Sequence, residues 1–189
     1  MTAPGPHLFW ITSRAAGTAA LVLASLSVSA GLLVGGRLLG GRWKTIDFRV
    51  GHEALSLATL LAIAVHGLAL LGDSFLHPGP LDIAVPFVGA YRPLWTGIGI
   101  VAGWALALLG LSYYGRRWIG ATRWRAIHRF TVLAWAAAVL HSLLAGTDAG
   151  QVWFLALTAL VGVPAVVLFL ARVIRPSRAG PAARTGSAA

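Results

Sequence analysis

The stretch HEALSLATLLAIAVH, residues 52–66, raises the question on which the interpretation of the whole chain depends. It has a histidine at each end, and Glu53 is its only charged side chain. A second stretch, HRFTVLAWAAAVLH, residues 128–141, also begins and ends with histidine. Ionisable side chains inside apolar segments are costly, so these four histidines require a buried partner or a function.

The composition indicates an integral membrane protein. The chain has 189 residues, of which 58% are hydrophobic and 11% charged, whereas soluble domains have about 25% charged residues. It contains no cysteine, which excludes disulfides, thiolate metal sites and iron–sulfur clusters. The net charge of +10 comes from basic clusters between apolar segments, a pattern of membrane topology that gives no indication of nucleic-acid binding.

Five segments have the roughly 20 apolar residues that a membrane-spanning helix needs. They are approximately residues 12–36, 50–72, 93–114, 127–146 and 152–174. We therefore predict an all-α, polytopic helix bundle over residues 1–174, with no cleaved signal peptide, followed by a disordered cytoplasmic tail over 175–189. The connection HPGPLDIAVPFVGAYRP, residues 77–93, contains four prolines and is not expected to be helical throughout.

The basic residues predict the orientation of the bundle. They gather in two connections and at the C-terminal end of the chain: Arg37, Arg42, Lys44 and Arg49; Arg116, Arg117, Arg123, Arg125 and Arg129; Arg172, Arg175, Arg178 and Arg184. The opposite side has only Arg14 and Arg92. The positive-inside rule then places the N-terminus outside and the C-terminus in the cytoplasm. Six tryptophans near span ends resemble an aromatic belt, whereas Trp104 and Trp135 lie mid-span and are expected to pack inside.

This topology sorts the four histidines into two levels. The second and fourth spans run in the same direction, so His52 and His128 lie at the inner ends while His66 and His141 lie nearer the outer face. Each helix separates its two histidines by about 20 Å. Two imidazoles at one depth suit the axial positions of a haem iron. The pattern favours an inner site of His52 with His128 and an outer site of His66 with His141.

The fourth span presents a geometric difficulty. Fourteen residues from His52 to His66 return to within about 40° of the same helix face, but thirteen from His128 to His141 miss it by about 140°. Local overwinding, helix crossing or a sideways approach must absorb the difference. Small residues near the histidines, among them Gly67 and Ala134, would allow a flat macrocycle to approach closely, although small residues are common at any membrane helix interface.

Two segments resemble a known family. TRWRAIHRFTVLAWAAAVLH, residues 122–141, and FRVGHEALSLATLLAIAVH, residues 48–66, resemble the haem-bearing helices of the ferric reductase-like transmembrane domain. That family includes membrane ferric reductases, NADPH oxidases and the haem subunit of the methionine sulfoxide reductase system. The resemblance covers roughly residues 8–172. The family usually has six helices, and its large members append a flavin- and nicotinamide-binding module that this sequence lacks.

The resemblance implies two b-type haems, each held by two histidines, that pass single electrons across a prokaryotic plasma membrane. As a cytochrome b-like oxidoreductase component, the chain would receive electrons from a separate cytoplasmic flavoprotein reductase or a quinol. An extracytoplasmic acceptor would take them. Three alternatives stay open: the membrane subunit of a two-component reductase of the methionine sulfoxide type, a divalent-metal channel or transporter, and a purely structural subunit.

Other residues are weaker candidates for the haem sites. Arg125 and Arg129 flank His128 and would meet an inner haem propionate, or lipid phosphate instead. Arg14 would meet an outer propionate, or would reach to the membrane surface. Glu53 would accept a proton or line a quinone site, or would simply be solvated. His7 and His77 are interpreted as exposed outer residues.

Overall fold

The computed structural model describes residues 5–35 and 42–174, and over that part of the chain its regular secondary structure consists of helices alone. The all-α prediction is confirmed. The predicted disordered tail, residues 175–189, lies outside the described residues. The helices are α1 (Gly5–Gly35), α2 (Arg42–Leu70), α3 (Pro80–Ala84), α4 (Pro93–Leu111), α5 (Arg116–Ile119), α6 (Ala121–His128), α7 (Thr131–Ala145) and α8 (Val152–Ile174).

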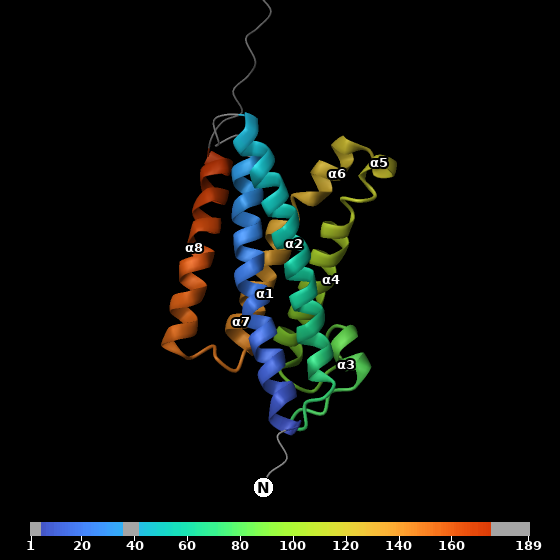
Figure 1. Ribbon diagram of the computed structural model, residues 1–189. Coiled ribbons are helices and arrows are strands. Elements are labelled where there is room, and N and C mark those ends of the chain that lie inside the picture. Colours follow the sequence, from blue (N-terminus) through green and yellow to red (C-terminus); the bar gives the residue numbers. More distant parts are fainter. Residues whose placement is uncertain (1–4, 36–41, 175–189) are drawn as a thin grey trace, which may run out of the picture.

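Five segments of the bundle are long and apolar enough to cross a membrane, as in a multi-pass membrane protein. They are His7–Gly35, Asp47–Leu70, Pro93–Leu111, Ala121–Ala145 and Val152–Ile174, and they lie side by side in Figure 1. The predicted spans agree with them to within a few residues at most ends. The bundle has an N-terminal end, where α1 begins, and a C-terminal end, where α8 ends.

Helix α1 is the central element and contacts α2, α7 and α8, while α4 packs against α7 (Figure 1). The buried core joins Ala24, Val28 and Leu32 of α1 to Trp135 of α7 and Ala165 of α8. Trp135 donates its indole N–H to Ser25 Oγ, 3.0 Å away, so its polar atom is satisfied in the core. Its predicted packing role is confirmed.

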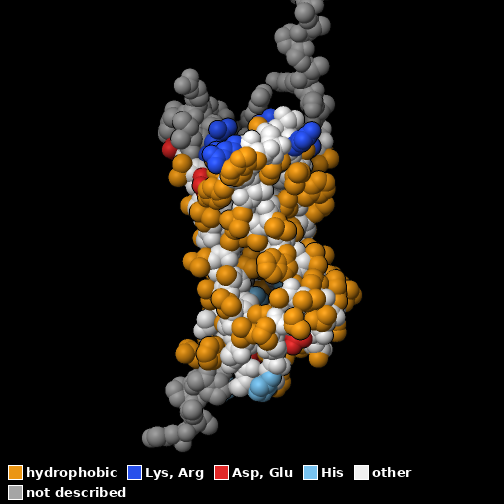
Figure 2. Space-filling view, turned by 90° about the vertical axis from the view of Figure 1, so that its right-hand side faces the viewer, with side chains coloured by type: hydrophobic (Ala, Val, Ile, Leu, Met, Phe, Trp, Pro, Cys, Tyr) orange, Lys and Arg blue, Asp and Glu red, His pale blue; other side chains and the backbone are white. Residues whose placement is uncertain are grey.

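The outer surface of the bundle is strongly apolar. Figure 2 shows hydrophobic side chains over most of the visible wall, with Lys and Arg gathered at the C-terminal end. Large apolar side chains such as Leu108, Leu160 and Val167 are more than half exposed. Such a surface is favourable in contact with lipid chains and would be costly in water.

The predicted fourth span, residues 127–146, corresponds to Ala121–Ala145, and its helix is interrupted after His128. α6 ends at His128 and α7 begins at Thr131. Between them the backbone hydrogen bonds span three residues: the Phe130 N–H donates to Ile127 O and the Leu133 N–H to Phe130 O, both at 3.0 Å. Thr131 Oγ1 also donates to His128 O, 2.6 Å away. The turn is therefore wound more tightly than an α-helix.

This tight turn reduces the geometric difficulty of the thirteen-residue spacing. A 3₁₀ residue rises about 2.0 Å and turns about 120°, against 1.5 Å and 100° in an α-helix. Three such residues lengthen the thirteen-residue segment to about 21 Å, the rise of fourteen α-helical residues. They also remove about 60° of the angular mismatch. Local overwinding, one of the three possibilities, is what the backbone adopts.

The connection from α2 to α4 contains the short helix α3 and is otherwise irregular, as its four prolines predict. His77, Phe87 and Arg92 have positive φ angles of 45°, 69° and 40°. The expectation that Trp104 packs inside is wrong, because its side chain is 55% exposed on α4. Its indole N–H donates instead to Ala84 O at the end of α3, 2.9 Å away.

Candidate functional site

The four histidines form two facing pairs inside the bundle. The ring centres of His52 and His128 are 6.2 Å apart, and those of His66 and His141 are 6.5 Å apart. The ring planes cross at 79° and 69°. The two spans therefore run in the same direction, with one histidine from each span at each level, as the sequence predicts.

Every one of these rings uses its Nδ1 atom to contact a backbone carbonyl of a neighbouring helix. The partners are Ser27 O for His52 and Ser13 O for His66, both at 2.8 Å, Trp95 O for His141 at 2.9 Å and Leu109 O for His128 at 3.3 Å. A carbonyl only accepts, so Nδ1 carries the hydrogen. The Nε2 atom of each ring then carries the free lone pair, as is usual in metal-binding histidines.

The separation of the rings fits one metal ion between each pair. An imidazole nitrogen binds a first-row transition metal at about 2.0 Å and lies about 1.15 Å from its own ring centre, so two rings on opposite sides of one ion have centres about 6.3 Å apart. The observed 6.2 and 6.5 Å bracket this value. Within the described residues, no cluster of three or more His, Cys, Asp or Glu side chains suits a metal ion. Two histidines alone leave the equatorial ligands to a macrocycle such as haem.

A repeat in α1 holds the two histidines of α2. The sequences SRAAG, residues 13–17, and SVSAG, residues 27–31, place a serine and a glycine fourteen positions apart, the same interval as His52 and His66. A Cβ atom on Gly17 would lie 2.9 Å from His66 Nδ1, and one on Gly31 would lie 3.0 Å from His52 Cε1. A contact below 3.0 Å is essentially never seen for a real Cβ atom, and one at 3.0 Å is tighter than most, so an added methyl would force each ring to shift.

The serines of this repeat add side-chain hydrogen bonds to the same contacts. Ser13 accepts from the His66 ring through its carbonyl and donates its hydroxyl to His66 O, 3.1 Å away. At the other level, Ser56 donates to His52 O, and the hydroxyls of Ser27 and Ser56 lie 2.8 Å apart. Ser13 and Ser27 are both buried. Sequence reasoning missed them, although the repeated Ser-x-x-x-Gly spacing is a detectable signal.

Helix α4 holds the two histidines of the fourth span in a similar way. Its acceptors, Trp95 O and Leu109 O, are also fourteen residues apart. The His141 ring lies so close to Gly99 that a Cβ atom there would collide with it. Gly99 was also missed, since a single glycine in an apolar span has no distinctive signal in the sequence.

His128 is held differently from the other three histidines. Its acceptor, Leu109 O, lies near the end of α4 and also accepts from Ser112 Oγ at 2.6 Å. The Trp124 ring stacks on the His128 ring, with centres 4.9 Å apart and planes at 24°. Trp124 also donates to Ser112 Oγ, 3.2 Å away. Trp124 thus supports His128 from within α6, beyond its predicted place in an aromatic belt.

The arginines proposed for haem propionates lie in two different environments. Arg14 forms a two-pronged ion pair with the buried Asp148 in the α7–α8 connection. Its guanidinium also lies 4.9 Å from the centre of the Trp10 ring. Arg125 and Arg129 are exposed at the C-terminal end of the bundle, on either side of His128. Arg14 therefore has a protein partner that the sequence did not predict.

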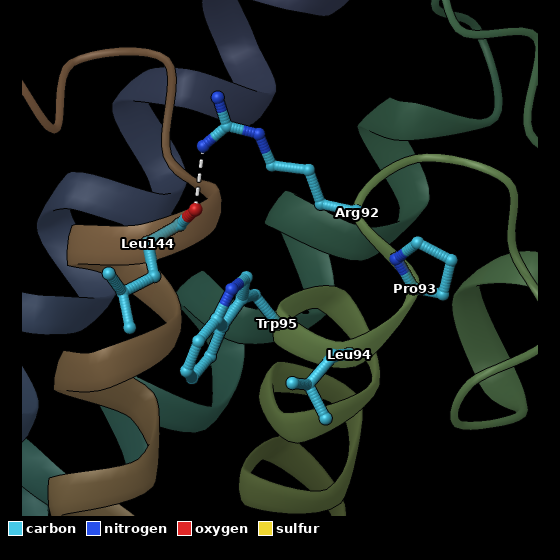
Figure 3. A pocket seen from close by; sticks show the side chains of 5 residues that line it. All are labelled: Arg92, Pro93, Leu94, Trp95 and Leu144. Carbon is cyan, nitrogen blue, oxygen red and sulfur yellow. Dashed lines mark hydrogen bonds between the residues drawn. The ribbon is translucent and has the colours of Figure 1, made fainter.

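An open pocket lies beside the His66–His141 level, at the N-terminal end of the bundle (Figure 3). Arg92 reaches across its mouth and donates to Leu144 O, 2.6 Å away, while Trp95 points toward α7. Tyr91 donates to Ala145 O, 3.1 Å away. Arg92 and Tyr91 thus satisfy carbonyl groups at the C-terminus of α7, which have no hydrogen-bond partner within the helix.

The remaining candidates lie away from the paired rings. Glu53 accepts a hydrogen bond of 2.9 Å from Tyr114 at an exposed position. His7 is exposed. His77 lies in the irregular connection between α2 and α3, and its N–H donates to Asp73 O. Neither of the last two belongs to a facing pair in the described part of the chain.

Comparison with protein-family models, with curated proteins and with solved structures gives no match for this chain. The functional argument therefore depends on the geometry of the paired histidines.

Proposed function

We propose that this protein is a transmembrane electron conduit of the ferric reductase-like kind, with two bis-histidine b-type haems. His52 and His128 would hold the haem nearer the C-terminal end, the predicted cytoplasmic side, and His66 and His141 the other. The observation that carries the proposal is the pair of ring separations, 6.2 and 6.5 Å. Both match the spacing of two imidazoles on one iron.

The protein's own groups would do the positioning. Carbonyls of α1 and α4 fix the tautomer of each ring, and Gly17, Gly31 and Gly99 let three rings lie against neighbouring backbones. Bound haem would supply reversible one-electron chemistry at each level. The levels lie about 20 Å apart along the bundle. Electrons would pass from a cytoplasmic flavoprotein or a quinol toward an extracytoplasmic acceptor. With a flavoprotein as donor, the chain would be the membrane subunit of a two-component reductase.

A divalent-metal channel or transporter is less well supported. It requires ligand clusters along a pore, and the described residues contain no group of three or more metal-binding side chains. The only carboxylate within the paired-histidine stretches, Glu53, is hydrogen bonded to Tyr114. Because every Nδ1 is hydrogen bonded, each ring has only its Nε2 atom left to bind a metal. Two such nitrogens suit the two axial positions of a haem iron but are too few ligands for a free ion.

The deciding experiment is a visible spectrum of the purified protein, oxidised and then reduced with dithionite, together with haem quantification. We expect two non-covalent b-type haems per chain, both six-coordinate and low-spin, and both extractable by acid acetone because the chain has no cysteine. Folded, monodisperse protein that binds no haem when haem is supplied would refute the proposal.

Four alanine variants then test the pairing. His66→Ala and His141→Ala should remove the same redox component in a potentiometric titration, and His52→Ala and His128→Ala the other. About half of the haem signal should remain in each, because the levels share no ligand. His7→Ala serves as the control and should keep both components. Loss of one component by both His66→Ala and His52→Ala would contradict the assignment of levels.

A further inference from the structure

The segment from α3 to Val88 has features unlike those of a water-exposed loop. Leu81 is 70% exposed and Val88 is 54% exposed, and Phe87 is also more than half exposed. Asp82 is the only charged residue between Pro78 and Tyr91. Its carboxylate is already engaged, since it accepts from the Gly79 N–H at 2.8 Å. Apolar side chains facing outward with the single charge satisfied internally suit a lipid environment.

Two contacts bring this segment against the membrane-spanning part of α4. Trp104 lies eleven residues into α4, about 16 Å from its first residue along the axis, and its indole N–H donates to Ala84 O. Helical side chains lean toward the N-terminus of their helix, so the indole reaches back along α4 without passing its end. The Phe87 ring packs on Gly97, one turn into α4, where a Cβ atom would collide with it. The end of α3 thus lies within the length of the span.

The prolines of this segment have a physical role in such a place. An unpaired backbone N–H in hydrocarbon costs several kcal/mol, at the upper end of the range of about 2–7 kcal/mol for a buried polar group. Pro78, Pro80 and Pro86 carry no N–H and so remove three donors that the irregular backbone could not pair. Helix α3 and the bond from Trp104 satisfy further groups.

We propose that residues 80–88 form a short re-entrant hairpin that inserts into the bilayer leaflet at the N-terminal end of the bundle and packs on the lipid-facing side of α4. The occupant of its exposed face is lipid, because the segment contacts α4 at Trp104 and Gly97, and the exposed side chains of α4, among them Leu94, Val101 and Leu108, are apolar as well. The hairpin also braces α4 at Gly97, two residues from Gly99 beside His141. The inference does not depend on haem binding.

Spin labelling tests the insertion directly, because the chain has no cysteine. The variants Leu81→Cys and Val88→Cys would be labelled in phospholipid nanodiscs, and their collision rates with oxygen and with a soluble nickel chelate measured. Val167→Cys on α8 is the lipid-facing control, and Gly150→Cys in the α7–α8 connection is the aqueous control. We expect both hairpin labels to favour oxygen over nickel, as at Val167. Nickel accessibility equal to that of Gly150→Cys would overturn the proposal.

A second variant tests the hydrogen bond from Trp104 that holds the hairpin against α4. Trp104→Phe keeps an aromatic ring but removes the donor to Ala84 O, so nickel accessibility at a label on residue 81 should rise. Leu108→Phe, on the same exposed wall, is the matched control and should leave it unchanged. A hairpin that occupies the aqueous side to contact a soluble partner would give high nickel accessibility in all of these variants, and that result would also reject the inference.

Discussion

The two histidine pairs have similar ring separations but differ in how firmly the protein holds them. At the His66–His141 level both rings lie against a glycine, and their Nδ1–carbonyl bonds are 2.8 and 2.9 Å. At the other level His52 is held in the same way, but the His128 bond is 3.3 Å and its ring stacks on Trp124. His128 also directly precedes the tight turn between α6 and α7.

The comparison shows two ways in which the protein fixes the position of a histidine ring: by packing it against backbone and by stacking it on an aromatic side chain. A glycine contact fixes a ring by excluding other positions, and it fails abruptly when a side chain is added. A stacked indole contributes about 0.5–1.5 kcal/mol and yields gradually. We therefore expect the tightest glycine contact, Gly99 on His141, to fail in an all-or-none way and the stacking of Trp124 on His128 to respond in a graded way.

The largest effect should come from Gly99→Val. The added side chain would occupy the position of the His141 ring and displace it from His66. With the proposed haems bound, the variant should lose the haem at that level and retain about half of the total, as a ligand deletion would. Haem quantification and potentiometric titration give the result. Gly103→Val is the control, because a Cβ atom at Gly103 meets only Ile63, at 3.5 Å. Equal loss in both variants would show that α4 simply does not tolerate valine.

A smaller effect is expected from Gly17→Ala and Gly31→Ala. The added methyl would lie about 3 Å from a ring atom, so the ring must shift by a few tenths of an ångström, at a cost of about 1–3 kcal/mol. Each variant should alter the spin state or midpoint potential of one haem only: the His66 level for Gly17→Ala and the His52 level for Gly31→Ala.

Gly67→Ala is the control for both variants. Gly67 adjoins His66, yet a Cβ atom there meets nothing within 4 Å. An unchanged titration in Gly17→Ala and Gly31→Ala alike would contradict the role of the repeat in α1.

Replacing Trp124 should affect only the His52–His128 level. Trp124→Leu removes the stacked ring and the donor to Ser112, while His128 keeps its carbonyl partner. The midpoint potential of that haem should shift by up to about 60 mV, the one-electron equivalent of about 1.4 kcal/mol. Trp124→Phe should restore most of it. Trp118→Leu, at a highly exposed residue, is the control. A shift at the other level would mean that the two pairs are not independent.

The smallest effect is expected from Ser13→Ala. It removes the hydroxyl bond to His66 O but leaves the carbonyl that accepts from the ring, so about 1 kcal/mol of stability should be lost with both haems retained. Thermal unfolding in detergent, followed by loss of haem absorbance, measures this change. The control Ser29→Ala removes a hydroxyl that donates to Ser25 O within α1. Loss of haem from Ser13→Ala would show that the hydroxyl itself fixes His66.

Much of the fold could be predicted from composition and spacing. Runs of about 20 apolar residues are constrained by bilayer thickness alone, so α8 matches its predicted span from Val152 to Ile174. Span direction alternates along the chain, and this alternation already places His52 with His128 and His66 with His141. The interruption after His128 could not be predicted, because no proline or glycine marks it. The thirteen-residue spacing was equally compatible with overwinding, helix crossing or a sideways approach of the ring.

Sequence alone therefore determined that this is a helical membrane protein with five spans, since this depends on hydropathy. It also determined which histidines share a level, since this depends on their order along the chain. Tertiary structure decided what holds the rings. The contacts of Gly17, Gly31 and Gly99 with histidines, the stacking of Trp124 on His128 and the pairing of Arg14 with Asp148 join residues on different helices or connections, or across a turn. Such contacts depend on helix rotation and crossing, and the apolar faces of membrane helices leave both open until the helices pack.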